Sequence, residues 1–286
     1  MAGTLYLCAT PIGNLEDITL RVLKLMERVD VIAAEDTRNT LKLLNHFEIK
    51  TPMTSYHEHN KVTKGPVLVE RLLAGESIAL VTDAGMPGIS DPGADLVKLC
   101  YAAGVPVTVA PGASAAVVAL VLSGLDTRRF VFEGFLPVPK RDRRERLAFL
   151  QNETRTMIFY EAPHKLRGTL DDLAAAFGAD RSVSLCRELT KLHEEIKKTT
   201  LGEAVAFYKD NDPRGEYVLV MAGAPAGEDA DAGLTLEQAA QRALELTGEG
   251  FGPTAAAKAA AQGTPYSKSE VYKQLLVLQQ DRQTAE

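Results

Sequence analysis

The sequence predicts an α/β protein made of two α/β domains, followed by a small module of helices alone. Short apolar runs rich in Val and Ile recur from Thr4 to Met221, and stretches with helical periodicity separate many of them. This alternation is typical of sheets with substantial parallel pairing. At about 150 residues per domain, the 286 residues are enough for two domains with a core each.

The predicted strands are short runs of mostly apolar residues, a pattern that indicates burial on both faces of a sheet. We expect them at Thr4–Ala9, Asp30–Ala34, Ser77–Thr82, Val105–Ala110, Phe130–Phe135, Thr156–Tyr160, Ser182–Cys186 and Glu216–Met221. Between the first two, Ile18, Val22 and Leu25 recur at i, i+4 and i+7, which predicts a helix. Further helices are expected at Thr37–Phe47, Pro92–Ala103 and His164–Phe177.

Two interruptions of this pattern mark the expected domain boundaries. Gly124 and Asp126 break it within Ser123–Arg129, between two blocks of similar size. After Ala222 the residues become small and acidic, which is typical of a linker. We therefore expect an N-terminal α/β domain at 1–124, a second α/β domain at 125–226, a linker at 227–234 and a helical module at 235–286.

The expected helical module carries three helix signals. Thr235-x-x-Gln238 and Ser267-x-x-Glu270 have the form of capping boxes, and Pro253 begins an alanine-rich stretch that Gly263 closes. Three short helices fit a helix-turn-helix-like module that contacts nucleic acid. A small helical bundle that binds nothing would have the same pattern.

The composition is that of an ordinary folded protein, with 45% hydrophobic and 24% charged residues. The three scattered cysteines lack the CxxC spacing of zinc or redox sites, and their odd number argues against a secreted disulfide framework and fits the cytosol. The apolar run Ala113–Leu122 is too short to span a bilayer, and we expect neither export nor membrane anchoring. A net charge of −6 gives no global attraction to nucleic acid, so such a partner needs a local basic patch.

Glycine and proline gather in five segments that each follow a predicted strand: Thr10–Asn14, Thr82–Gly93, Pro111–Ser114, Tyr160–His164 and Ala222–Pro225. Loops converge at the carboxyl ends of strands in α/β sheets, so we expect these segments to form a ligand site at one edge. Glycines such as Gly85, Gly88 and Gly112 would let main-chain groups approach an adenosine-like molecule. The alternative is that these residues only form turns.

Several other chemistries lack their motifs. The sequence has no GxxxxGK[ST] and no GxGxxG, which argues against nucleotide hydrolysis and NAD chemistry. It also has no GxSxG hydrolase signature. His57 and His59 lack a clear third ligand, so we expect no metal site.

Six segments spread over nearly the whole chain match a known family: Leu7–Ile18, Ala34–Arg38, Ser55–Asn60, Thr82–Gly93, Tyr160–His164 and Cys186–Glu195. In these segments the chain resembles the ribosomal RNA branch of the tetrapyrrole methylase-like (class III) S-adenosylmethionine-dependent methyltransferase family. The Thr82–Gly93 loop indicates the superfamily. Glu35–Arg38 and Arg187–Lys191 narrow it to the ribosomal RNA branch.

The resemblance implies a homodimer of two-domain α/β chains of tetrapyrrole methylase type, with the cofactor S-adenosyl-L-methionine in the inter-domain cleft. It implies methyl transfer to the ribose 2′-oxygen of a cytidine, cytidine 1402, in the decoding region of 16S rRNA, as free RNA or in the small ribosomal subunit. The implied cofactor contacts are Pro11, Gly13, Asp83, Ala84, Gly85, Met86, Ser114, Ala115, Tyr160, Glu161 and Gly223.

This reaction needs collinear oxygen, carbon and sulfur, and it gains from a base that takes the hydroxyl proton. The candidate bases are Glu133, Glu161 and Glu188, each within or just after an apolar strand, where burial favours a raised carboxylate pKa. The alternative is that each pairs with an arginine or caps a helix. Asp83 suits the cationic amino group of the methionine moiety, with turn formation as its alternative role.

RNA binding needs positive charge, and the strongest cluster is Lys140–Arg146, with a local charge of +3. The expected phosphate contacts are Lys140, Arg141, Arg143 and Arg144, and the alternative is a solvated helix face. Arg38, Arg187 and Lys191 are further candidates. Alternatively, Arg187–Glu188 and Lys191–Glu195 are internal ion pairs.

Two other functions remain open on the sequence. One is methylation of a small molecule or a protein side chain on the same fold. The other is a non-catalytic nucleic-acid-binding regulator that uses the helical tail. The basic cluster and the tail favour a large anionic substrate over the first, and cofactor binding distinguishes an enzyme from the second.

Overall fold

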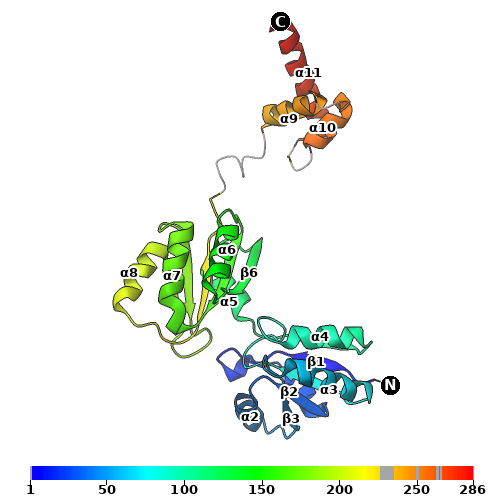
Figure 1. Ribbon diagram of the computed structural model, residues 1–286, viewed down its shortest axis with the longest axis vertical. Coiled ribbons are helices and arrows are strands. Elements are labelled where there is room, and N and C mark those ends of the chain that lie inside the picture. The colour runs from blue at the N-terminus through cyan, green and yellow to red at the C-terminus, as the bar shows by residue number, and fades with distance from the viewer. Residues whose placement is uncertain (1, 226–234, 249–250, 262–263, 265, 286) are drawn as a thin grey trace. The chain divides into compact units, whose positions relative to one another are not determined.

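The computed structural model describes residues 2–225, 235–248, 251–261, 264 and 266–285 (Figure 1). The chain divides into two compact units, Met1–Ala224 and Pro225–Glu286. The first unit contains two five-stranded sheets, and the second contains helices. The linker expected at 227–234 lies outside the described residues.

The first sheet is entirely parallel, with the strand order β3-β2-β4-β1-β5. Its strands are β1 (Leu5–Cys8), β2 (Val31–Ala34), β3 (Met53–Ser55), β4 (Ile78–Val81) and β5 (Val107–Ala110). β2 and β4 are buried along their whole length, as continuous apolar runs predict. Both faces of this sheet therefore need a cover of helices.

Two pairs of helices provide that cover. The 3-10 turn η1 (Leu15–Asp17) leads into α1 (Leu20–Arg28), which packs with α2 (Thr37–His46) on one face. The other face holds α3 (Lys61–Leu73) and α4 (Gly93–Ala102). The side chain of Thr19 accepts a hydrogen bond from Val22 N–H and so fixes the start of α1.

The strand order places a topological switch point between β1 and β4. From β1 the chain crosses to β2 on one side, whereas from β4 it crosses to β5 on the other. The connections that follow β1 and β4 therefore cross to opposite sides of the sheet. In open α/β sheets, ligands bind at this position.

The second sheet is mixed, with the strand order β6-β7-β10-β8-β9. Its strands are β6 (Phe130–Phe135), β7 (Thr156–Glu161), β8 (Ser182–Arg187), β9 (Glu195–Thr200) and β10 (Tyr217–Met221). β6 pairs with β7 in parallel, and all other pairs are antiparallel. The expectation of substantial parallel pairing is thus confirmed by the first sheet, whereas in the second sheet a hairpin and a reversed central strand replace the crossover connections.

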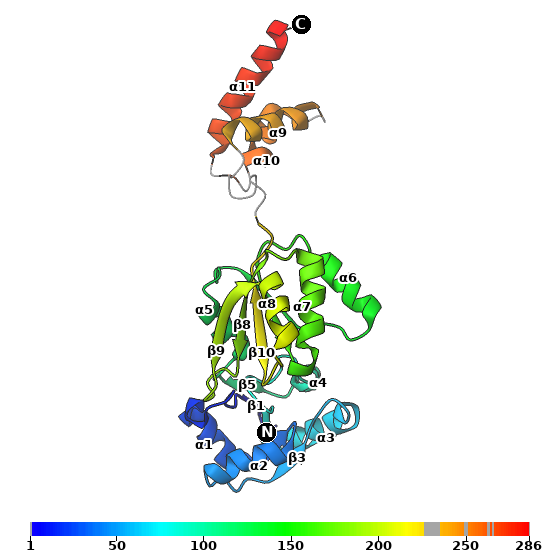
Figure 2. The same cartoon turned by 90° about the vertical axis from the view of Figure 1, so that its left-hand side faces the viewer.

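Helices cover both faces of the second sheet as well. α5 (Ala115–Ser123) packs on one face, and α6 (Lys140–Leu150), α7 (Pro163–Phe177) and α8 (Leu201–Asp210) form a layer on the other (Figure 2). α5 precedes the boundary expected after residue 124, yet its apolar residues pack with the second sheet. The boundary itself stays a prediction.

The second unit consists of α9 (Leu236–Gly248), α10 (Pro253–Ala261) and α11 (Lys268–Ala285) around a small core of alanines with Val271 and Leu275. Both predicted capping boxes are confirmed, since Thr235 pairs reciprocally with Gln238 and Ser267 with Glu270. Among the described residues of either unit, no helix combines the length and the apolar character needed to cross a membrane.

Candidate active site

A cleft of about 420 Å³ lies where the carboxyl ends of β1, β4 and β5 meet the second sheet. The first sheet contributes Ile12, the loop after β4, and Ser114 and Ala115 at the start of α5. The second sheet contributes Tyr160 and Glu161 from β7, the turn after β8, and the first residues of β10. The switch point of the first sheet therefore opens into this cleft.

Backbone hydrogen bonds fix the loop after β4 in its cleft-lining position. Thr10 and Gly85 exchange two of them, N to O at 2.9 and 3.0 Å, which ties the loops after β1 and β4 together. Asp91 accepts from the N–H groups of Gly88, Ile89 and Gly93 at 2.7 to 3.0 Å. Gly85 (φ 79°) and Gly88 (φ 89°) are left-handed, a conformation that glycine adopts without strain.

The turn between β8 and β9 forms the opposite wall of the cleft. Glu188 and Thr190 have φ values of 51° and 65°, so this turn holds two residues in a sparsely populated conformation. It also lies against the first loop, because a Cβ on Gly13 would come within 2.4 Å of Lys191 Cγ. Only glycine permits this close approach.

The lining of the cleft is strongly acidic. Among the described residues that line it, one is basic, Lys191, and six are acidic: Glu35, Asp83, Asp91, Glu161, Glu188 and Glu216. Burial raises the pKa of Asp83, with a further contribution from the charge of Asp36. Burial likewise raises the pKa of Glu35, which lies close to Asp83 and Asp91. A cationic ligand would relieve this crowding of negative charge.

Apolar groups complete the site. Ile12, Leu189 and the aromatic rings of Phe135 and Tyr160 line the cleft, and these two rings contact each other edge to face with centroids 5.6 Å apart. Burial raises the pKa of the Tyr160 hydroxyl. The cleft thus combines acidic groups with apolar surface, a combination suited to a ligand that is both cationic and aromatic.

Comparison with known proteins assigns the chain to a family. A family model described as Tetrapyrrole (Corrin/Porphyrin) Methylases matches residues 4–205. The chain is 47% identical to Ribosomal RNA small subunit methyltransferase I of Synechocystis over 279 residues, 98% of this chain and 99% of that protein. The chain belongs to the ribosomal RNA small subunit methyltransferase I family. The relative from Halalkalibacterium halodurans is 53% identical over 221 residues, 77% of this chain and 76% of that protein.

A solved structure supports the fold. Uroporphyrin-III C-methyl transferase from Thermus thermophilus, complexed with S-adenyl homocysteine, matches with a TM-score of 0.54 and 18% identity over 76% of this chain and 97% of that chain. The tetrapyrrole methylase fold and the expected enzyme class, an S-adenosylmethionine-dependent methyltransferase, are confirmed. The residues present fit this cofactor, because its sulfonium and ammonium charges match the acidic lining and its adenosine matches the apolar surface.

Most of the cofactor contacts expected from the family resemblance line the cleft: Asp83, Ala84, Gly85, Met86, Ser114, Ala115, Tyr160 and Glu161. Pro11 and Gly13 line a neighbouring smaller pocket of about 220 Å³, which shares Thr82 and Asp83 with the cleft. Gly223 lies elsewhere. It follows the carboxyl end of β10, which is antiparallel to β7, and is packed against the backbone of Thr154. The expectation that all five glycine and proline segments share one edge is therefore wrong for Ala222–Pro225.

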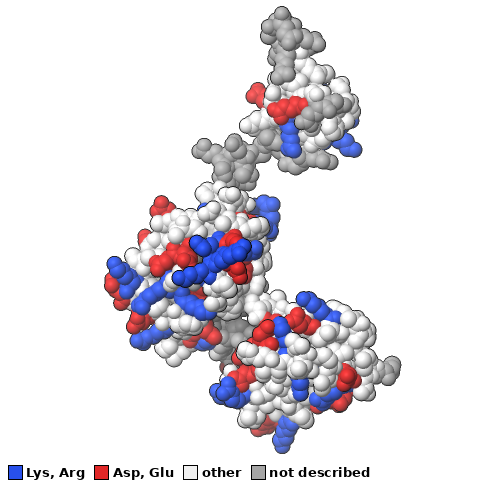
Figure 3. Space-filling view, in the orientation of Figure 1, with Lys and Arg blue, Asp and Glu red and all other residues white. Residues whose placement is uncertain are grey.

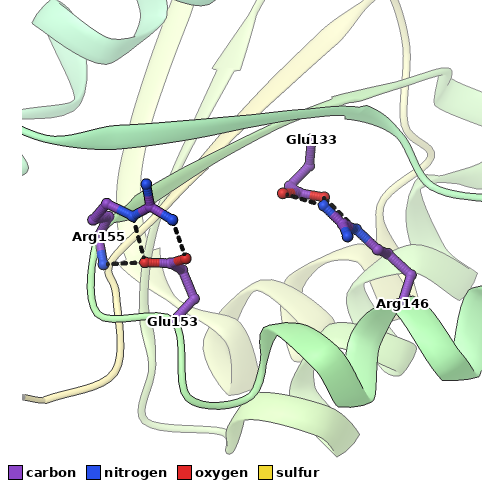
Figure 4. Close-up of polar contacts among 4 residues, drawn as sticks. All are labelled: Glu133, Arg146, Glu153 and Arg155. Carbon is purple, nitrogen blue, oxygen red and sulfur yellow. Dashed lines mark hydrogen bonds and ion pairs between the residues drawn. The ribbon is translucent and has the colours of Figure 1, made fainter.

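The three predicted bases have different surroundings. Glu133 is outside the cleft lining and accepts two hydrogen bonds from Arg146, at 2.7 and 2.8 Å (Figure 4). Glu161 lines the cleft, but its oxygens accept hydrogen bonds from Thr169 and from Ala162 N–H. Glu188 also lines the cleft, but the hydrogen bond from Lys191 lowers its pKa, so the expected rise is wrong there.

The predicted basic cluster forms α6, where Lys and Arg side chains alternate with acidic ones (Figure 3). Lys140, Arg141 and Arg144 are exposed, and Arg141 pairs with Glu145 at 2.8 Å. Arg143 differs, because its side chain is 16% exposed and is held by Asp172 and Thr169. The surface of α6 therefore offers Lys140, Arg141 and Arg144, whereas Arg143 fixes α6 to α7.

The other predicted phosphate contacts are engaged within the protein. Arg38 forms a bidentate ion pair with Asp36, although its side chain is 87% exposed. Arg187 pairs with Glu195 across the hairpin, and Lys191 pairs with Glu188 and Glu216. The alternative of internal ion pairs is thus confirmed, but with other partners than Glu188 for Arg187 and Glu195 for Lys191, because residues 188–194 form a loop between two strands and not a helix.

Two features of the cleft were missed from the sequence. Glu35 lines it directly after β2, within one of the segments that carried the family resemblance, yet no role was expected for it. Glu216 and Tyr217 line it from the amino-terminal end of β10. Strand direction, which determines this placement, has no local signal in the sequence.

Proposed function

We propose that this protein transfers the methyl group of S-adenosylmethionine to the ribose 2′-hydroxyl of cytidine 1402 in 16S rRNA. The observation that carries the proposal is the 47% identity, over nearly all of both chains, to a ribosomal RNA small subunit methyltransferase I. The acidic cleft supports it, because a sulfonium donor is cationic. The proposal includes a homodimer that acts in the cytoplasm on the small ribosomal subunit.

Asp83 is the residue we assign to the amino group of the donor. Its carboxylate lies in the cleft, and the loop that carries it is fixed by Asp91 and by the Thr10–Gly85 bridge. Main-chain groups of Gly85 and Met86, together with Tyr160, would hold the rest of the molecule. When bound, the donor supplies an electrophilic methyl carbon.

The protein's principal contribution to rate would be orientation. Holding two reactants in line contributes roughly 7–11 kcal/mol in favourable cases. Walls from both sheets enclose the cleft, so the donor and the ribose would be held by separate elements. Lys140, Arg141 and Arg144 on α6 would bind phosphates of the RNA.

A labelling experiment tests this function. Purified protein should bind S-adenosylmethionine in calorimetry and transfer labelled methyl to small ribosomal subunits from cells that lack the gene. Mass spectrometry should then locate one new 2′-O-methyl group, on cytidine 1402. Methylation of a tetrapyrrole or of a protein side chain, without rRNA labelling, would refute the proposal, as would the absence of cofactor binding.

A further inference from the structure

The chemistry of the cleft requires a group that can take a proton, and its six carboxylates are the main candidates. A base must lie within hydrogen-bond reach of the substrate hydroxyl and must have an oxygen that the protein does not already occupy. The hydrogen bonds of each carboxylate therefore decide which of them can act. Four of the six accept hydrogen bonds of 3.0 Å or less within the protein.

Two of these carboxylates accept hydrogen bonds that fix the local structure around them. Asp91 accepts from three N–H groups of its own loop, at 2.7 to 3.0 Å. Glu161, which is 5% exposed, accepts from the hydroxyl of Thr169 and from Ala162 N–H. Both side chains therefore maintain local structure.

Two more are bound to the single lysine among the described lining residues. Lys191 Nζ donates to Glu188 at 2.8 Å and to Glu216 at 2.9 Å. The pKa of Glu188 is lowered, first by this bond from Lys191. A carboxylate that is held as an anion by an ammonium group is a weak proton acceptor.

Asp83 is set apart by its assignment above to the donor's amino group. A carboxylate that balances a positive charge on the donor would not at the same time take the proton of the acceptor.

Glu35 is the remaining carboxylate, and its surroundings differ. Its backbone is fixed by a hydrogen bond from its N–H to Val81 O on the neighbouring strand β4. Its side chain is partly exposed to the cleft and accepts one long hydrogen bond, 3.4 Å from Asp83 N–H. The charged and titratable groups that act on it are Asp83 and Asp91 from the loop after β4 and His57 after β3. Burial is the largest cause of its raised pKa, and a raised pKa makes the carboxylate a stronger proton acceptor.

We propose that Glu35 is the catalytic base, and that it takes the proton from the ribose hydroxyl as the methyl group is transferred. This inference rests on the function proposed above. The oxygen–hydrogen bond breaks and the proton passes to a Glu35 carboxylate oxygen. The freed oxygen electron pair forms the bond to the methyl carbon, and the pair of the broken carbon–sulfur bond stays on sulfur. Glu35 then releases its proton to water after the products leave.

The test uses the full-length Glu35→Gln variant in single-turnover methylation of small ribosomal subunits, at saturating enzyme and cofactor. Loss of a positioned base should slow transfer by about 10²–10⁴-fold. Cofactor affinity by calorimetry and subunit affinity by filter binding should change less than about threefold. The wild-type rate should rise with pH along a limb of unit slope and then level off, and this limb should be absent from Glu35→Gln. Glu27→Gln, an exposed carboxylate change on α1, is the matched control.

A second variant keeps the test independent of folding. Glu35→Asp retains a carboxylate, so it should transfer methyl at least about tenfold faster than Glu35→Gln and should show the rise of rate with pH again. Thermal unfolding should show that both variants are folded. Transfer by Glu35→Gln at the wild-type rate, or a loss that disappears at saturating cofactor, would overturn the assignment while leaving the proposed function standing. Wild-type protein that labels no rRNA would overturn both.

Discussion

The two sides of the cleft use the same type of residue in opposite ways. On the side of the first sheet, Glu35 and Asp83 lie without a lysine or arginine in the cleft to neutralise them, and burial raises the pKa of each. On the side of the second sheet, Lys191 holds Glu188 and Glu216, and the pKa of Glu188 is lowered. The comparison shows that the partners of a carboxylate determine its role: the first side can bind a cation or take a proton, and the second side is a fixed wall.

The largest effect on cofactor binding is expected on the side of the first sheet, at Asp83. Asp83→Asn should weaken S-adenosylmethionine binding by about 10–100-fold, because a charge-assisted hydrogen bond contributes roughly 1.5–3 kcal/mol. Since only the ionised carboxylate binds the cation, wild-type affinity should fall as pH falls through the raised pKa of Asp83. This fall should be much smaller in Asp83→Asn. Calorimetry at intervals of about one unit from roughly pH 5 to 8 measures both.

An unchanged cofactor affinity in Asp83→Asn would contradict the comparison of the two sides, because the side of the first sheet would then not be the side that binds the cation. Asp30→Asn is not a suitable control, since Asp30 accepts a hydrogen bond from Ser77 N–H. Asp171→Asn on α7, an exposed carboxylate, changes the charge equally and should leave the affinity unaltered.

A smaller effect, on RNA binding, is expected at α6. This helix also carries two kinds of basic side chain: exposed ones, and Arg143, which other side chains hold. Lys140→Ala with Arg144→Ala should weaken RNA binding and reduce the slope of log affinity against log salt by about 1–2, since each phosphate contact contributes about 0.7–0.9. Arg143→Ala should instead lower the thermal midpoint, because Arg143 holds Asp172 and Thr169. Filter binding from about 50 to 200 mM salt measures the slope. An equal slope in the double variant and the wild type would contradict the assignment of α6.

The smallest effect is expected from the fixed wall, at Lys191. Lys191→Met keeps the apolar stem that packs at Gly13 but removes the charge, and it should cost about 1 kcal/mol in the free energy of unfolding at pH 7. The lowered pKa of Glu188 means that its stabilising contribution is present above its ordinary value of 4.5 and is lost as pH falls through the lower folded value. Urea unfolding should therefore show the difference at pH 7 and little of it well below the lowered pKa.

Lys24→Met, on the exposed side of α1, is the control for Lys191→Met. Equal stability of Lys191→Met and wild type at pH 7 would show that the second side is not fixed by this ion pair. The contrast between the two sides would then have to rest on burial alone.

Much of the first side could be predicted from the sequence, because parallel strands between helices bring successive loops to one edge. The loop after β4 and the start of α5 are where the glycine and proline pattern indicated a ligand. Less of the second side could be predicted. β9 contains two lysines and two threonines and lacks the apolar run of a buried strand, as suits its place at the edge of the sheet.

The partners of charged residues were the least predictable part. Arg187 pairs with Glu195 because β8 and β9 form a hairpin, and this pairing depends on a register that the sequence does not state. Gly223 was expected beside the cofactor because loops were assumed to share an edge, an assumption that fails when a central strand runs in reverse. Glu35 was missed because its importance follows from the partners that it lacks in the cleft, and these are known only once its neighbours are located.

The hydrogen atom that Gly13 carries in place of a side chain has a mechanical consequence. Since the stem of Lys191 occupies the space where a methyl group would be, the loop after β1 and the turn after β8 touch at this point. Even the smallest side chain would act as a wedge there, and it would push these two walls apart beside the cleft.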